Sequence, residues 1–322
     1  MPNYSGVWSL STQFQNRDGW PSPPLAGGGA VGVFFGGDEA SGHTDRIQYI
    51  EIASTGNSED FGNLVTNNYG GFACGSTVRG LNAGGYNNGV EVNMIQFVTI
   101  HTKGDASDFG DLTAEKNLAN GCGSSTRGIF AAGANSSGAL NVIEYVTFAS
   151  AGDAIDFGDL TVSQANRAAC SSPTRGIVGG GYYSAIINVI DYFTIASAGN
   201  ALDFGDLTAS KGIFAACSSE TRGLFGGGDD SSVQTNVIEY ITIASTGNGT
   251  DFGDLSTDYI KNMASCSSSV RGVWAGGQQG NTRIDNIQYV TIASLGNTSD
   301  FGDLLAANRI FQGTSSDHGG LQ

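Results

Sequence analysis

Acidic and amide side chains recur at a fixed spacing along this 322-residue chain, and they are the residues best suited to metal chemistry. Each copy of a repeated motif carries Asp or Asn at positions i, i+3 and i+6, as in Asp105, Asp108 and Asp111. Such oxygen ligands suit a hard cation such as calcium. The same side chains also cap backbone N–H groups in turns. We expect the turn role and no cofactor, with calcium as the alternative. The middle aspartates are Asp60, Asp108, Asp156, Asp203, Asp251 and Asp300.

Arginine recurs with the same period, each time directly before a glycine. We expect these arginines to form structural ion pairs with the repeated aspartates of the same or a neighbouring unit. A sialidase would need an arginine triad at unique positions, so this regular pattern argues against that enzyme. The repeated arginines are Arg79, Arg127, Arg175, Arg222 and Arg271.

The five cysteines occupy one equivalent position of successive repeats. Equivalent positions in neighbouring units are unsuited to disulfide geometry, and an odd number of thiols excludes complete pairing. We therefore expect small, buried packing residues. The three histidines, His43, His101 and His318, fall in different units without paired cysteines, which argues against a metal centre. With no nucleophile motif either, the sequence predicts a protein that is not an enzyme. The cysteines are Cys74, Cys122, Cys170, Cys217 and Cys266.

Composition excludes further classes of function. The chain holds 14 Lys and Arg against 30 Asp and Glu, a net charge of -16, and such a surface repels the phosphates of nucleic acid. No apolar run is long enough for a transmembrane helix, so we expect no membrane insertion. Fifty glycines together with many aromatic residues instead indicate short strands joined by tight turns.

The string Asp-Phe-Gly-Asp-Leu, or its Asn variant, occurs six times at intervals of 47 to 49 residues. Each unit reads as four short strands: in the fourth unit, a run of small residues at 167–172 precedes an apolar pair with glycines, a β-branched strand at 189–195 and a closing strand. Four strands in about 48 residues are typical of a propeller blade. The repeats end near residues 64, 112, 160, 207, 255 and 304.

The two ends of the repeat array complement each other. The first unit lacks its small-residue strand, and the residues after 304 match only that strand. We therefore predict an all-β fold, a six-bladed β-propeller at 31–322 whose first blade is closed by the C-terminal strand. Residues 1–30 form an N-terminal arm outside the repeat.

The pattern resembles the kelch motif, in which an apolar pair and a diglycine, as at 177–180, precede a strand that contains Tyr. The kelch tryptophan is absent, and the Phe or Leu of the repeated motif stands in its place. This resemblance implies a propeller but no particular function.

The loops between the second and third strands differ completely between units, at 38–44, 86–90, 134–140, 182–187, 229–235 and 278–283. Variable loops on a rigid scaffold are a common arrangement for binding. Their residues suit polar partners, including sugars or a protein surface. The candidate binding residues are Asp38, His43, Tyr86, Asn88, Asn135, Tyr182, Tyr183, Asp229, Asp230, Gln278 and Arg283.

The arm contains apolar residues that we expect to dock onto other proteins: Trp8, Leu10, Phe14 and Trp20. Its start, residues 4–10 followed by Trp20-Pro21, and the repeated Asn-Val-Ile-Glu-Tyr-Val-Thr pattern resemble structural proteins of tailed bacteriophages, marine cyanophages in particular. This resemblance implies a virion component, such as a tail, fibre or capsid-surface protein on the phage particle. Its arm would bind other virion proteins, and its loops a host surface glycan or protein.

Two other functions stay open. The first is a lectin-like, carbohydrate-binding propeller used for host receptor recognition. The second is an enzyme that cleaves host glycans, although no unique set of ionisable residues breaks the repeat symmetry.

Overall fold

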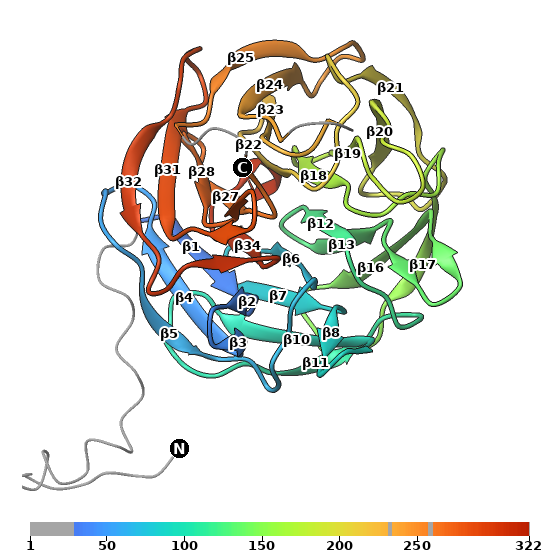
Figure 1. The fold of residues 1–322 in the computed structure, drawn as a ribbon. Helices are drawn as coiled ribbons and strands as arrows, with labels where there is room; N and C mark the ends of the chain where they lie inside the picture. Colours follow the sequence, from blue (N-terminus) through green and yellow to red (C-terminus); the bar gives the residue numbers. More distant parts are fainter. Residues whose placement is uncertain (1–28, 231–233, 257–259, 322) are drawn as a thin grey trace, which may run out of the picture.

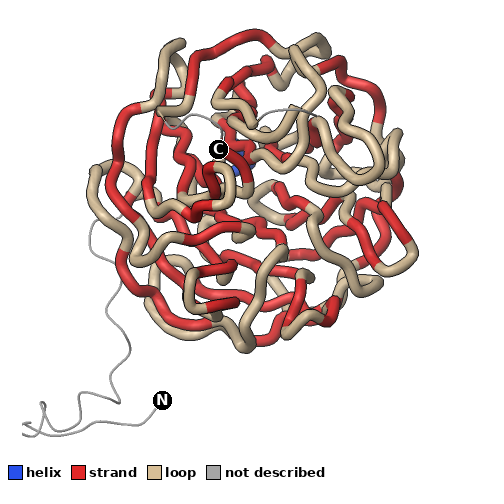
Figure 2. Tube along the Cα trace, in the orientation of Figure 1, coloured by secondary structure: helices blue, strands red, loops and turns tan. Residues whose placement is uncertain are grey.

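The computed structural model describes residues 29–230, 234–256 and 260–321, and this part of the chain is all-β and propeller-like. Six four-stranded antiparallel sheets are arranged around a common centre (Figure 1). Strands and loops make up almost all of the trace, and the short 3-10 helix η2 (Gly319–Leu321) lies at the C-terminus (Figure 2). The fold thus agrees with the all-β class expected from the repeat.

Each sheet contains strands of four to six residues. From the strand nearest the centre outward, the first sheet contains β34 (Gln312–Ser315), β1 (Val31–Phe35), β4 (Arg46–Glu51) and β5 (Glu59–Asn63), and the second contains β6 (Phe72–Gly75), β7 (Arg79–Ala83), β10 (Met94–Thr99) and β11 (Ser107–Asp111). The third contains β12 (Asn120–Gly123), β13 (Arg127–Ala131), β16 (Val142–Thr147) and β17 (Ile155–Asp159), and the fourth contains β18 (Ala168–Ser171), β19 (Arg175–Gly179), β20 (Val189–Thr194) and β21 (Leu202–Asp206). The fifth contains β22 (Ala215–Ser218), β23 (Arg222–Gly226), β24 (Val237–Thr242) and β25 (Thr250–Asp254), and the sixth contains β27 (Ala264–Ser267), β28 (Arg271–Ala275), β31 (Asn286–Thr291) and β32 (Ser299–Asp303).

The first sheet takes one strand from each end of the repeat array. The C-terminal strand β34 pairs antiparallel with β1, with Gly32 opposite Ser315. The backbone N–H of Val31 also donates to Ser316 Oγ at 3.0 Å, and Ser316 N–H donates back to the Val31 carbonyl at 3.0 Å. The C-terminal segment therefore supplies the strand that the first unit lacks.

The inner strands follow one another in a cyclic order, β34 beside β6, then β12, β18, β22, β27 and again β34. Just before each inner strand, one residue adopts a left-handed backbone and donates its N–H to the carbonyl of the equivalent residue in the preceding unit, at 2.9–3.1 Å. The cycle returns to its start when Gly70 donates to Ile310. Its members are Gly70, Leu118, Asn166, Ile213, Asn262 and Ile310.

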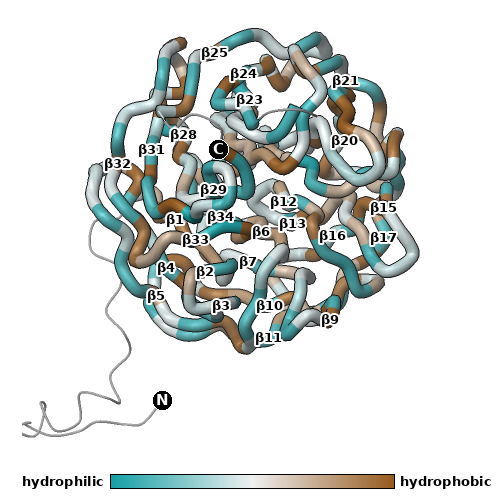
Figure 3. Tube along the Cα trace, viewed as in Figure 1, coloured by the Kyte–Doolittle hydropathy of each residue, from teal (hydrophilic) through white to brown (hydrophobic). Residues whose placement is uncertain are grey.

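The apolar core lies between neighbouring sheets rather than in one central mass. Six clusters of buried residues each combine two adjacent sheets, and one of them joins the sixth sheet to the first through Phe311 and Phe34. Apolar and polar residues are accordingly interspersed around the whole molecule (Figure 3). Burial of side chains from both partners at each junction holds the sheets together.

The repeated Asp-Phe-Gly motif fastens each outer strand to the following sheet. In the third sheet, Gly199 N–H donates to the carbonyl of Phe157 at 2.7 Å, and Ala201 N–H donates to that of Asp159 at 2.8 Å. A Cβ on Gly158, where φ is +146°, would lie 2.5 Å from the Gly199 oxygen. Only glycine allows this approach. The same contact recurs at all six junctions, and we call it the outer clip.

The first Asx of each triad, not the middle aspartate, does the capping, and it acts between sheets. Asn200 Oδ1 accepts the backbone N–H of Asp159 in the preceding sheet at 3.0 Å, and Asn57 accepts that of Asp303 across the last junction. Among the described residues, the Asp156 carboxylate is exposed and accepts no hydrogen bond. Sequence reasoning placed the cap within one hairpin because the partner strand lies about 40 residues away in the chain.

A buried polar position on the third strand of each sheet forms another junction contact. It is acidic in three sheets, where a buried cation from the preceding connection pairs with it: Glu144 with Lys116, Asp191 with Arg167, and Glu239 with Lys211. In the other sheets it is a glutamine: Gln48, Gln96 or Gln288. Burial lowers the pKa of Lys211, although Glu239 acts in the opposite direction. Charge at these sites is therefore balanced pair by pair.

The outer clip predicts unequal effects for two exposed residues. Asn200→Ala should lower the free energy of unfolding by about 1 kcal/mol because a backbone N–H loses its acceptor. Asp156→Ala should change it by less than about 0.5 kcal/mol. Urea denaturation of both variants checks this, and a larger loss for Asp156→Ala would contradict the assignment.

Because each buried acid is paired with a buried cation, removing both charges should destabilise the fold less than removing one. Glu239→Gln should cost about 3 kcal/mol because Lys211 stays buried without its counter-charge. Adding Lys211→Asn should restore most of the loss, since Gln96 and Asn68 occupy the equivalent positions of another junction. A double-mutant cycle measured by denaturation gives the coupling energy between Lys211 and Glu239, and additive losses of stability would disprove the compensation.

Candidate binding face

The six variable loops fold into small hairpins at one end of the sheets, which we call the hairpin face. Four of them contain short paired strands: β2 (Asp38–Glu39) with β3 (Gly42–His43), β8 (Tyr86–Asn87) with β9 (Val90–Glu91), β14 (Ala134–Asn135) with β15 (Gly138–Ala139), and β29 (Gln278–Gln279) with β30 (Thr282–Arg283). Two connections between sheets extend these pairs, β33 (Asn308–Arg309) beside β2 and β26 (Ile260–Lys261) beside β29. Backbone pairing thus holds the hairpins close to the scaffold.

Asp38 is the centre of a charged cluster between the sixth and first sheets. Its Oδ2 accepts hydrogen bonds from Arg283 Nη2 and Arg309 Nε, both at 2.8 Å, and Arg309 also donates to Gln278 Oε1 at 2.6 Å. Burial alone would raise the pKa of Asp38, but the two arginines outweigh it and lower the pKa. Asp38, Gln278 and Arg283, predicted to bind a partner, therefore contact one another and tie two hairpins together.

Other predicted residues also stabilise their hairpins. Asp229 forms a salt bridge with Lys261 at 2.7 Å, and Asp230 follows it on the same hairpin. Asn135 Oδ1 accepts the N–H of Ser137 at 2.9 Å, and Asn88 takes a left-handed turn conformation with φ of +51°. These polar side chains shape the face.

Three aromatic rings form a stack over the first two sheets. His43 stacks on Tyr69 with 3.8 Å between ring centroids, and Tyr69 stacks on Tyr86 at 5.1 Å. Next to the stack, Glu91 accepts hydrogen bonds from Asn117 Nδ2 at 2.7 Å and from Ser136 N–H at 3.1 Å. Burial and the Glu91 carboxylate raise the pKa of Tyr86. The stack is an ordered aromatic platform with an exposed histidine at its end.

Sequence reasoning missed Tyr69 because it lies in a connection between sheets rather than in a variable loop. The signal available was its neighbour Gly70, which marks the start of the inner strand. Tyr182 and Tyr183 were both predicted, and both are exposed, at 41% and 48%.

A small cavity of about 30 Å³ lies among the left-handed residues that precede the inner strands. Leu118, Ile213 and Ile310 provide apolar walls, and Asn166 and Asn262 provide amides. All five are half-buried. The hairpin face therefore offers aromatic rings, amides and a hollow at one end of the axis.

The repeated arginines lie at the opposite end, and the predicted pairing with aspartates is wrong. Arg127 donates to the Ile195 carbonyl of the next sheet at 2.9 Å and stacks over Tyr145 of its own sheet at 4.6 Å. The equivalent donors reach carbonyls at 2.6–3.0 Å. A carbonyl and an aromatic face suit this position because the aspartates face solvent on the outer strands. The other four are Arg79, Arg175, Arg222 and Arg271.

The five cysteines are free and buried, as expected. Each lies on an inner strand, and the Cys74 Sγ occupies the space where a Cβ on Gly128 of the next sheet would lie, at 2.6 Å. Burial raises the pKa of Cys122 to about 12, so its thiol stays protonated. Within the described ranges, no group of three or more His, Cys, Asp or Glu is placed to hold a metal ion.

The four predicted docking residues of the arm, Trp8, Leu10, Phe14 and Trp20, lie outside the described residues. In the part of the chain that the structure covers, no helix is both long and apolar enough to cross a membrane.

No protein-family model matches this chain, and no curated protein matches it. The function is therefore inferred from the residues and their geometry alone.

Proposed function

We propose that this chain is a six-bladed, kelch-like propeller and serves as a non-enzymatic structural protein of a tailed-phage virion. The cyclic order of the inner strands, the hydrogen-bond cycle through Gly70 and Ile310, and the recurrence of the outer clip at six junctions support a closed ring. Closure removes the exposed strand edges that an open array would have. A rigid ring of this kind suits display on a particle.

Contact with a host or with other virion proteins is assigned to the hairpin face. The observation that carries this assignment is the contrast between the two parts of each repeat. The outer clip recurs in all six units and the arginine in five, while the hairpins differ and expose His43, Tyr182 and Tyr183. Exposed aromatic residues on a rigid support are favourable contact residues because they lose little conformational entropy on binding.

The N-terminal arm is assigned to assembly. Its tryptophans lie outside the repeat, and the described ring has a complete core without them. Trp8 and Trp20 would provide the apolar contact area for a neighbouring virion protein. The arm and the hairpin face would then bind different partners.

The second candidate is carbohydrate binding at the same face. The stack of His43, Tyr69 and Tyr86, next to the fixed Glu91 carboxylate and the amides around the axial hollow, favours it. Aromatic faces pack against the C–H faces of sugars, and amides and carboxylates bind hydroxyl groups. The acidic surface favours neutral over anionic sugars.

The assembly role is tested by affinity capture from a lysate of infected source cells. The full chain should retain capsid or tail proteins, identified by mass spectrometry, and a variant lacking residues 1–25 should lose them while keeping its melting temperature. Loss of cooperative melting would instead make the arm part of the fold. Equal capture by both proteins would argue against the arm.

The face role is tested by surface substitutions that spare the core. His43→Ala and Tyr183→Ala should each weaken binding to purified host envelope polysaccharide or outer-membrane protein by about tenfold, the loss of roughly 1.4 kcal/mol. Leu202→Ala, exposed on an outer strand, is the matched control and should bind normally. Equal affinities for all variants, measured by biolayer interferometry, would refute this assignment.

A further inference from the structure

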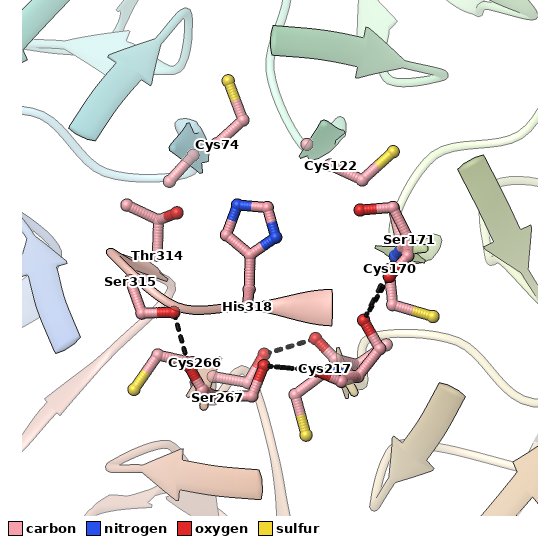
Figure 4. A pocket seen from close by; sticks show the side chains of 17 residues that line it. Cys74, Cys122, Cys170, Ser171, Cys217, Cys266, Ser267, Thr314, Ser315 and His318 are labelled. Carbon is pink, nitrogen blue, oxygen red and sulfur yellow. Dashed lines mark hydrogen bonds between the residues drawn. The ribbon is translucent and has the colours of Figure 1, made fainter. Parts of the chain in front are cut away.

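The C-terminal segment enters the central axis at the end opposite the hairpin face. After β34 the chain turns inward, and η2 lies beside β12, β18 and β22. The His318 side chain is half-buried and lies in a cavity of about 50 Å³ lined by all six inner strands (Figure 4). Its Nε2 lies 2.8 Å from the Gly75 carbonyl, and the Gly320 N–H donates to its Nδ1 at 3.1 Å.

A serine ladder around the axis explains why the segment fits there. Ser171 Oγ donates to the Gly123 carbonyl at 2.7 Å, and Ser218, Ser267 and Ser315 each donate to the preceding inner strand at 2.6–2.8 Å. The equivalent position on β12 is Gly123, which has no hydroxyl for the Gly75 carbonyl. His318 supplies that missing hydrogen bond.

The two glycines also provide the space. A Cβ on Gly320 would lie 1.8 Å from the Gly123 oxygen, and a Cβ on Gly319 would lie 2.3 Å from the Ser219 oxygen. The Gly319-Gly320 pair therefore fits against the inner backbones only because neither residue has a side chain. The segment therefore fits this place in the axis by both shape and hydrogen bonding, and we call the place the seat of residues 317–321.

We propose that residues 317–321 form an acid-sensitive latch: neutral His318 holds the segment in the axis, and protonation of His318 releases it and loosens β34 at the junction of the first and sixth sheets. The latch goes beyond the proposed function and does not depend on it.

The hydrogen bonds define which form of His318 the seat accepts. Nε2 carries the proton that Gly75 accepts, and Nδ1 must be unprotonated to accept from Gly320. A second proton on Nδ1 would face the Gly320 N–H, so two donors would oppose each other. Protonation therefore breaks one hydrogen bond of the seat and adds a charge within the cavity.

The adjacent Asp317 carboxylate compensates that charge only in part. The titratable groups that line the cavity are the thiols of Cys74, Cys122, Cys170, Cys217 and Cys266, one on each of five inner strands. Their pKa values are raised by burial, so they stay neutral. The adjacent Asp317 carboxylate accepts hydrogen bonds from Ser269 at 3.3 and 3.4 Å. Among the described residues, no carboxylate lines the cavity.

The pKa of His318 determines how the stability of the latch depends on pH. Burial lowers the pKa of His318 in the seated form, with smaller opposing contributions from the Gly75 carbonyl and Asp317. The released form binds a proton more readily, near the ordinary pKa of about 6.5. The latch is therefore fully stable above that value and loses stability as the pH falls below it.

Hydrogen exchange of the C-terminal peptide tests the latch directly. In the full chain, protection of residues 313–321, corrected for intrinsic exchange rates, should fall about tenfold or more between pH 7.5 and pH 5.0, since seating weakens with each pH unit between the ordinary pKa of the released form and the lowered pKa of the seated form. His318→Gln keeps an amide donor for Gly75 and does not titrate, so its protection should not depend on pH. An undiminished wild-type protection factor at pH 5.0, or the same fall in the glutamine variant, would overturn the proposal.

A steric variant separates seating from titration. Gly320→Ala should expose the peptide at both pH values because its Cβ collides with the Gly123 backbone, while peptides of β18 and β19 stay protected. Gly247→Ala is the matched control, since a Cβ there meets no atom within 4 Å. Full protection of the C-terminal peptide in Gly320→Ala would show that the segment does not occupy this seat.

Discussion

The contact on which this structure depends is the approach of two glycine backbones at the outer clip. Gly158 and its counterparts come so close to the next sheet that a side chain is excluded, and two backbone N–H groups of that sheet donate to the carbonyls on either side of each such glycine. The outer strand of a sheet would otherwise expose unpaired N–H and C=O groups. Here its neighbour satisfies them. Because each clip joins a sheet to the following one, the angle between sheets is defined at the rim as well as at the axis.

Junction contacts at four radii reinforce one another. From the rim inward they are the outer clip, the buried polar position of the third strand, the second-strand arginine that reaches the next sheet's carbonyl, and the cycle through Leu118 and its equivalents. Nearly every repeated residue therefore acts between sheets rather than within one. This explains why the outer clip and the arginine recur from unit to unit, whereas the loops between the second and third strands differ.

The sequence was sufficient to predict the four-stranded sheets, but it was not sufficient to predict the hydrogen bonds between sheets. A period of about 48 residues with four strands in each unit predicted the sheets, and the missing strand at residue 31 predicted the pairing with β34. The partner of Arg127 could not be deduced, because a backbone carbonyl leaves no trace in sequence. The clip was misassigned for a similar reason: Asn200 acts on another unit. One signal was overlooked, since Glu144, Asp191 and Glu239 occur where the preceding connection supplies a cation.

The junction of the sixth and first sheets shows how contacts compensate for the two ends of the repeat array. The inner and second strands of the first sheet have no connecting turn, and Val31 replaces the repeated arginine there. The Asp38 cluster with Arg283 and Arg309 lies at this junction. The reciprocal bonds of Val31 with Ser316 reproduce, without a connecting turn, the bonds that a serine and the repeated arginine form in each of the other sheets. Beyond Ser316 the chain continues into the axis, where His318 contacts the second sheet. The last residues thus join the discontinuous sheet to its neighbours on both sides, and the symmetry of the repeat is broken where covalent continuity is lost.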